Sequence, residues 1–216
     1  MTATSLLALS YHEDWKAIRT YLSSNDATPA AKEAALTEQG PNGMTCLHYA
    51  CGYNGAPSDI IKSMVDMGGK YLVTMKTDNG ITALHYAYKY AATLEVVSLL
   101  VRIGGKDLVT MKDNSGRTAL HDLCLNIHSH SYPAGSIQLL IDVGGQDLLV
   151  AKDDNGNTAL DFATCASQAV KGLLTPLSQP ELSTTTATAT EIPLETNTPS
   201  TTPEGSSSNT THAATQ

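Results

Sequence analysis

The hydrophobic residues of this chain follow a helix-pair pattern that recurs in successive units. In the clearest copy, a first helix is predicted from Thr45 to about Tyr53 and a second helix from about Ser58 to Met67. Ile61, Met64 and Val65 fall at helical spacing in the second helix and predict its buried side. Because one helix pair alone cannot bury this side, the pattern predicts a stack of pairs.

Each unit begins with the same short phrase, a turn glycine followed by x-Thr-x-Leu-His, except that the fourth unit has Asp161 in place of the histidine. The turn glycines at positions 43, 80, 116 and 156 are 37, 36 and 40 residues apart, and a period in this range indicates stacked repeats. In the first three units we expect a Gly-Gly pair, such as Gly68-Gly69, to stop the second helix. A connecting arm, Leu72 to Asn79 in the first unit, would follow and end in a turn.

The first 42 residues lack the repeat phrase, and we interpret them as an N-terminal capping unit of two short antiparallel helices, because the end units of an array are usually atypical. Ser10 to Glu13 fits a capping box. Trp15, Ile18 and Leu22 then predict one face of a helix that ends near Ser23-Ser24-Asn25. Thr28-Pro29 favours a further helical turn with proline at its first position.

The C-terminal part of the chain contains an incomplete fourth unit and then a segment of different composition. A fourth unit has a first helix to about Ala166 and a shorter second helix from Ser167 to Leu174, which is typical of a C-terminal cap. Residues 178–216 are rich in Ser, Thr and Pro and contain no Lys or Arg, so we expect a disordered tail. Thr198 and Thr202 precede prolines and suit phosphorylation, but an inert tail is the favoured interpretation.

The phrase Gly-x-Thr-x-Leu-His-x-Ala, opening a helix pair and followed by a turn arm, resembles the ankyrin repeat family over about residues 43–175. The resemblance implies an all-α, ankyrin-like helical-repeat solenoid of about four to five helix pairs with elongated connecting arms. The units are longer than the roughly 33 residues typical of the family, so the arms are expected to contain an extra helical turn rather than clean β-hairpins. The expected division is 1–42, 43–79, 80–115, 116–155, 156–177 and the tail 178–216.

The charge and the composition of the chain argue against several classes of protein. The formal net charge of −8 argues against nucleic acid as a partner, because phosphate binding needs a basic face. No apolar run reaches the roughly 18 residues of a membrane span, and no basic stretch precedes an apolar core at the start. We therefore expect an intracellular, non-secreted monomer in the cytoplasm or nucleus, whose cysteines, Cys46, Cys51, Cys124 and Cys165, are free and mostly buried thiols.

Several residues suggest chemistry, but each has a simpler structural interpretation. His48 with Cys51 and His121 with Cys124 have zinc-ligand spacing, yet the two pairs should lie on the order of 20 Å apart, given 8–10 Å between packed helices. His128 and His130 are a second metal candidate in a loop. Cys124, His121 and Asp122 would form a hydrolase site, but no oxyanion loop is visible. We expect no enzyme activity, no metal and no cofactor.

By the resemblance, the repeat Thr and His residues are structural: Thr45, His48, Thr82, His85, Thr118, His121 and Thr158. The column of Lys76, Lys112 and Lys152 suggests an anion groove, but neighbouring aspartates favour an arm whose charges balance.

The expected function is a non-catalytic module that binds a protein partner on the concave repeat surface. The resemblance places contacts around each turn glycine and at the end of each first helix: Met44, Tyr53, Asp78, Asn79, Ile81, Lys89, Tyr90, Asn114, Arg117, Asn126 and Asn157. Of these, Met44, Tyr53, Ile81 and Tyr90 are expected to be exposed interface anchors. The alternative is a regulatory or inhibitory subunit of a partner enzyme.

Overall fold

A computed structural model describes residues 5–52, 55–127, 132, 134–164 and 166–175. The chain divides into two compact units, Met1–Ser178 and Gln179–Gln216, and every described residue belongs to the first. The expected tail therefore lies outside the described residues. Within them the structure is helical without strands, which confirms the all-α prediction.

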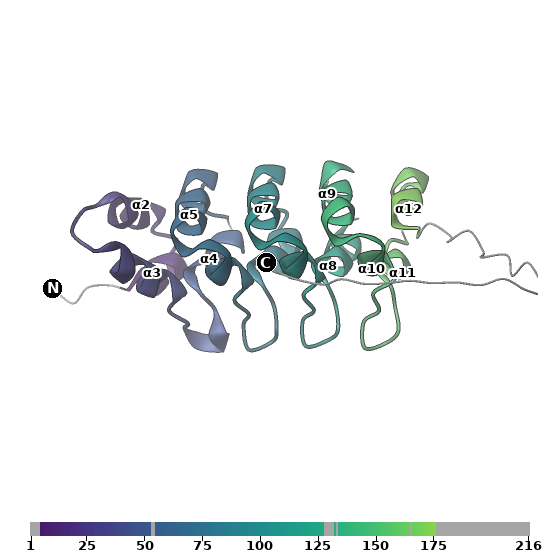
Figure 1. The fold of residues 1–216 in the computed structure, drawn as a ribbon, viewed down its shortest axis with the longest axis horizontal. Helices are drawn as coiled ribbons and strands as arrows, with labels where there is room; N and C mark the ends of the chain where they lie inside the picture. The colour runs from purple at the N-terminus through teal and green to yellow at the C-terminus, as the bar shows by residue number, and fades with distance from the viewer. Residues whose placement is uncertain (1–4, 53–54, 128–131, 133, 165, 176–216) are drawn as a thin grey trace, which may run out of the picture. The chain divides into compact units, whose positions relative to one another are not determined.

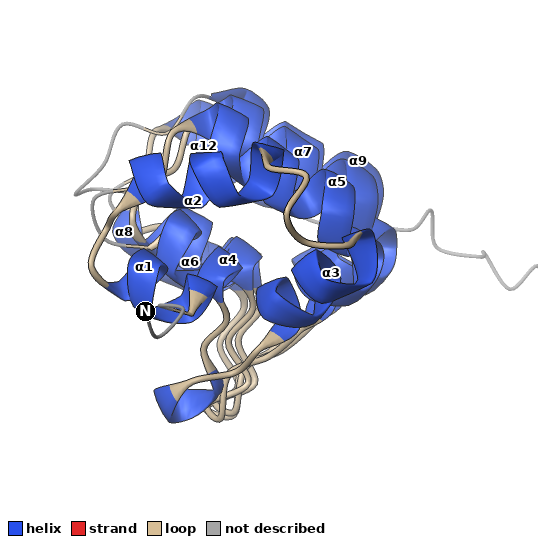
Figure 2. Ribbon diagram, turned by 90° about the vertical axis from the view of Figure 1, so that its left-hand side faces the viewer, coloured by secondary structure: helices blue, strands red, loops and turns tan. Residues whose placement is uncertain are grey.

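The helices form two layers and a row of loops. The inner layer consists of α1 (Leu6–Tyr11), α4 (Cys46–Cys51), α6 (Ala83–Lys89), α8 (Ala119–Asn126) and α11 (Ala159–Phe162). The outer layer consists of α2 (Trp15–Ser23), α5 (Ser58–Thr74), α7 (Leu94–Thr110), α9 (Ala134–Gly144) and α12 (Gln168–Leu174). The short helices α3 (Pro29–Thr37) and α10 (Gln146–Leu149) lie level with the inner helices in Figure 1. Figure 1 shows the units side by side, with the connecting arms below both layers. Figure 2, along the stack, shows these arms superimposed at one edge.

The inner helices are almost entirely buried on the sides that face their neighbours. Ala50, Ala87 and Ala163 are fully buried, and these small side chains let adjacent inner helices approach closely. One continuous core runs from Leu6 in the first helix to Leu174 in the last. This core explains why the units stack, since each one covers the apolar side of the next.

The double glycines interrupt the outer helices, which agrees with the predicted end of the second helix near Met67. Gly69 has φ 56° and ψ −155°, and the chain returns to helix after it until Thr74.

The equivalent Gly105 of α7 has φ 63° and ψ −157°. Glycine adopts such angles far more readily than other residues. After the bend the helix continues to Thr74 in α5 and to Thr110 in α7, because Leu72, Val73 and their counterparts are buried in the core. In the third unit the bend separates α9 from α10. The expected extra helical turn in the arms is therefore confirmed.

The N-terminal unit differs from the prediction in its caps and in its number of helices. Ser10 does not cap a helix, because its hydroxyl donates to the Leu6 carbonyl within α1. Ser5 and Asp14 accept the capping hydrogen bonds of α1 and α2 instead. The helix predicted from Trp15, Ile18 and Leu22 is confirmed, as is the proline start of α3, which makes three helices rather than two.

At the other end, the predicted short second helix is confirmed as α12, with the Ser167 hydroxyl at its N-cap. The first helix of this unit, α11, ends at Phe162 and is shorter than predicted. Within the part of the chain that is described, no helix has both the length and the apolar character needed to cross a membrane.

Candidate partner-binding surface

One position on four of the inner helices carries a side chain that is either polar or only partly buried. It lies four residues after the repeat threonine and is occupied by Tyr49, Tyr86, Asp122 and Phe162. In α4 every other residue is buried, and in α6 only Tyr86 and Lys89 are not. We call these four residues the groove row. Tyr11 of the first helix extends it, with its ring 5.8 Å from that of Tyr49.

The arms border this row and are fastened to one another by their backbones. The amides of Asp78, Asn114 and Asp154 donate to carbonyls of the preceding arm, at 2.9 to 3.0 Å. Within an arm, the Asp113 carboxylate accepts from the amides of Ser115 and Arg117 and so shapes the turn. A Cβ at Gly80 would come within 2.5 Å of the Asn114 side chain, so the close approach of these arms requires glycine there.

The lysine column also joins the arms. Lys76 Nζ donates to the carbonyl of Lys112 at 2.7 Å, and Lys112 Nζ donates to that of Lys152 at 2.8 Å. These amines are exposed but their hydrogen bonds run between units. The arrangement supports a structural role for the column over an anion groove.

The repeat histidines connect each inner helix to the next unit. In α6, His85 Nδ1 accepts from the Thr82 amide at 3.3 Å and lies 2.8 Å from the Thr82 hydroxyl. Since Nδ1 accepts, the proton of the neutral ring lies on Nε2, which donates to the Arg117 carbonyl at 3.2 Å. His48 and His121 do the same toward Ile81 and Asn157.

Burial keeps these rings neutral. It lowers the pKa of His48 and of His85 to about 4, and it also lowers the pKa of His121. In the fourth unit Asp161 takes the place of histidine and accepts from the Thr158 amide and hydroxyl. A carboxylate has no second nitrogen, so Asp161 cannot donate to a following unit in this way.

The predicted contact residues fall into three groups. Asp78, Asn79, Asn114 and Lys89 are exposed, while Ile81, Tyr90, Arg117, Asn126 and Asn157 are partly buried. Tyr53 lies outside the described residues. The expected exposure of Met44 is wrong, because it is 8% exposed and its sulfur lies 3.9 Å from the Tyr86 hydroxyl.

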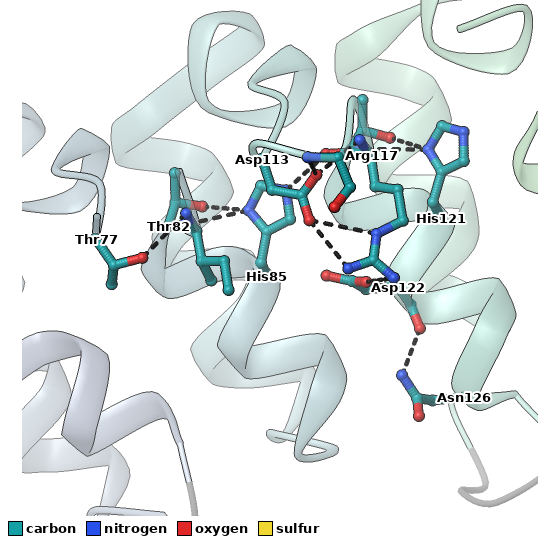
Figure 3. A network of polar contacts seen from close by, with 11 residues as sticks. Thr77, Thr82, His85, Asp113, Arg117, His121, Asp122 and Asn126 are labelled. Carbon is teal, nitrogen blue, oxygen red and sulfur yellow. Dashed lines mark hydrogen bonds and ion pairs between the residues drawn. The ribbon is translucent and has the colours of Figure 1, made fainter. Parts of the chain in front are cut away.

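A polar cluster lies where the second and third units meet, as Figure 3 shows. Arg117 donates to the Asp113 carboxylate from Nε at 3.3 Å and from Nη2 at 3.1 Å. Its Nη1 lies 3.9 Å from Asp122, whose pKa is raised to about 6 mainly by burial. The Asn126 amide donates to the backbone carbonyl of Asp122.

Comparison with known families gives a match over residues 6–110, to a family described as ankyrin repeats in three copies. The chain contains ankyrin repeats. A comparison with individually curated proteins gives no match. Ankyrin repeats are generally protein–protein interaction modules, which supports a protein partner for this chain.

The ankyrin stack does not assemble the hydrolase site considered from the sequence. Both nitrogens of His121 are engaged by Thr118 and Asn157. Burial raises the pKa of the Cys124 thiol to about 12, whereas a nucleophilic cysteine needs a lowered pKa. Among the described residues no three His, Cys, Asp or Glu side chains are grouped to hold a metal. His128, His130 and Cys165 lie outside them.

The prediction that the cysteines are buried is confirmed for Cys46, Cys51 and Cys124. The groove row itself was missed from the sequence. Its signal was available, because the position after each repeat histidine, or after Asp161, carries Tyr, Tyr, Asp or Phe in helices that are otherwise core.

Proposed function

We propose that the ankyrin stack binds a protein partner on the face that its inner helices and arms share, and we call this face the groove. The observation that carries the proposal is the aromatic part of the groove row. Tyr11 is 66% exposed and lies next to Tyr49, which is partly exposed. Tyr86 and Tyr90 of the next unit are also partly exposed. The rings of Tyr86 and Tyr90 are stacked, with centroids 6.0 Å apart.

Such a surface has the chemistry of an interface. Tyrosine offers a large apolar ring with a polar end and few rotatable bonds, so it is enriched at binding hot spots. The exposed arm tips, Asp78, Asn79 and Asn114, supply polar groups at the rim. The inter-arm hydrogen bonds hold these groups in a fixed array, which reduces the entropy lost on binding.

A comparative pull-down tests the proposal. The baits are the full chain, residues 1–177, and the full chain with Tyr49→Ser and Tyr86→Ser. Tyr71→Ser is the matched control, because Tyr71 is 65% exposed but lies on the outer helix α5. All baits are first compared by circular dichroism and thermal melting.

We expect one partner to be retained by the full chain, by residues 1–177 and by the control, and to be lost from the double variant. Loss from residues 1–177 would place binding in the tail. Retention by the folded double variant would contradict the groove as the binding site.

A further inference from the structure

Asp122 is the exception in the groove row. The equivalent residues in the other units are Tyr49, Tyr86 and Phe162, so a carboxylate takes the place of a ring. Asp122 is only 8% exposed. No described residue donates a hydrogen bond to its carboxylate oxygens, and the nearest cationic atom is Arg117 Nη1 at 3.9 Å.

The two neighbouring cations, Arg117 and Lys89, act on Asp122 without donating a hydrogen bond to it. Arg117 donates its two hydrogen bonds to Asp113, which is 8% exposed. Lys89 Nζ lies 5.6 Å from the centre of the Tyr90 ring. Asp122 thus has an ion pair with Arg117 but no hydrogen-bond donor among the described residues, and a buried carboxylate with unfilled hydrogen bonds is costly to a folded protein.

The surroundings favour a cation as the missing group. Aromatic faces attract cations, and the Lys89 contact shows that the Tyr90 ring does so here. The exposed arm tips add the carboxylates of Asp78 and Asp154, while the arm lysines Lys76 and Lys112 are held by backbone carbonyls of the next arm. A basic partner segment is therefore complementary to the groove.

We propose that Asp122 receives a lysine or arginine side chain from an extended partner segment that crosses the inner helices beside Tyr86 and Tyr90. This inference rests on the proposed function and specifies the chemistry of the partner. The basic side chain supplies the hydrogen-bond donor that Asp122 lacks, while the tyrosines contact the rest of the segment.

The test uses a display library of random nine-residue peptides, selected on the full chain, on Asp122→Asn and on Asp142→Asn. Asp142 is an exposed aspartate of the outer helix α9 and serves as the control. We expect lysine or arginine to be enriched at one peptide position with the full chain and the control, and not with Asp122→Asn. For a selected peptide, replacing the basic residue by glutamine should weaken binding about tenfold, and doing so on Asp122→Asn should add nothing.

Other outcomes overturn the inference: no selected peptides, no enriched basic residue, enrichment that persists on Asp122→Asn, or enrichment of acidic residues. Additive losses in the double-mutant cycle would also overturn it. The pull-down with the tyrosine variants is independent of Asp122, so the groove can be confirmed as the partner site while this inference fails.

Discussion

At the scale of single residues, the buried histidines make the stability of the stack depend on pH. His48 and His85 have a pKa of about 4 in the folded chain, against an ordinary value of 6.5. The unfolded chain therefore binds more protons between these values, so stability is complete above pH 6.5 and falls as pH decreases toward 4. Each histidine should remove roughly 2 kcal/mol between pH 7.5 and pH 5.

Urea unfolding of the wild type, His85→Ala and His12→Ala at both pH values measures this effect. His85→Ala should be less stable at pH 7.5, since it loses the hydrogen bonds to Thr82 and Arg117, and should lose about 2 kcal/mol less on acidification. His12 is exposed and its removal should change neither quantity. An unchanged pH dependence in His85→Ala would contradict the neutral buried ring.

Asp122 makes the stability depend on pH in the opposite direction from the histidines. Its pKa of about 6 in the folded chain exceeds the ordinary 3.8, so its charge destabilises the fold above pH 6 and this penalty disappears toward pH 4. Asp122→Asn should therefore raise the free energy of unfolding at pH 7 by about 1–3 kcal/mol. Denaturant titration at pH 7 and pH 4 checks this, and the gain should vanish at pH 4. A less stable variant at pH 7 would show that Arg117 compensates the charge.

At the scale of elements, the bends at the double glycines fix the outer helices. Gly105 has φ 63° and ψ −157°, and a Cβ there would meet nothing within 4 Å. Gly105→Ala should therefore cost about 1–3 kcal/mol through backbone strain alone. Gly172→Ala in α12 is the control, because it too has open space but should stabilise the helix by up to about 1 kcal/mol. Equal thermal melting of Gly105→Ala and the wild type would contradict the strain.

Some of these elements could be predicted from the sequence and others could not. The inner helices were predictable because the Thr and His of each capping box lie three residues apart and fold locally. The extra helical turn after Gly69 was expected from the length of the units, but its extent to Thr74 depends on the burial of Leu72 and Val73 against other helices. Met44 and Asp122 were misjudged or missed for the same reason, since neighbouring units determine their burial.

At the scale of the whole molecule, we propose that residues 1–42 form the cap, 43–177 the repeats and 178–216 a tail that does not contribute to folding. A chain ending at residue 177 should then unfold with the same midpoint and cooperativity as the full chain. Thermal melting of both chains by circular dichroism measures this. A midpoint lowered by more than a few degrees would assign the tail a structural role.

In a stack of repeats, a core substitution should destabilise mainly the units next to it, because each unit is stabilised mainly by its neighbours. The position of the substitution should therefore decide which helices lose stability. Leu100 of α7 and Leu174 of α12 are both buried, and replacing either by alanine should cost about 2–5 kcal/mol locally. Leu100→Ala should reduce hydrogen-exchange protection across α5 to α9, since α7 packs on both of those helices. Leu174→Ala should reduce it only in α9, α11 and α12, because α12 packs on the other two, and leave α4 to α7 unchanged. Uniform loss of protection in Leu174→Ala would instead mean that the chain unfolds as one cooperative unit, with the terminal helices as essential as the central ones.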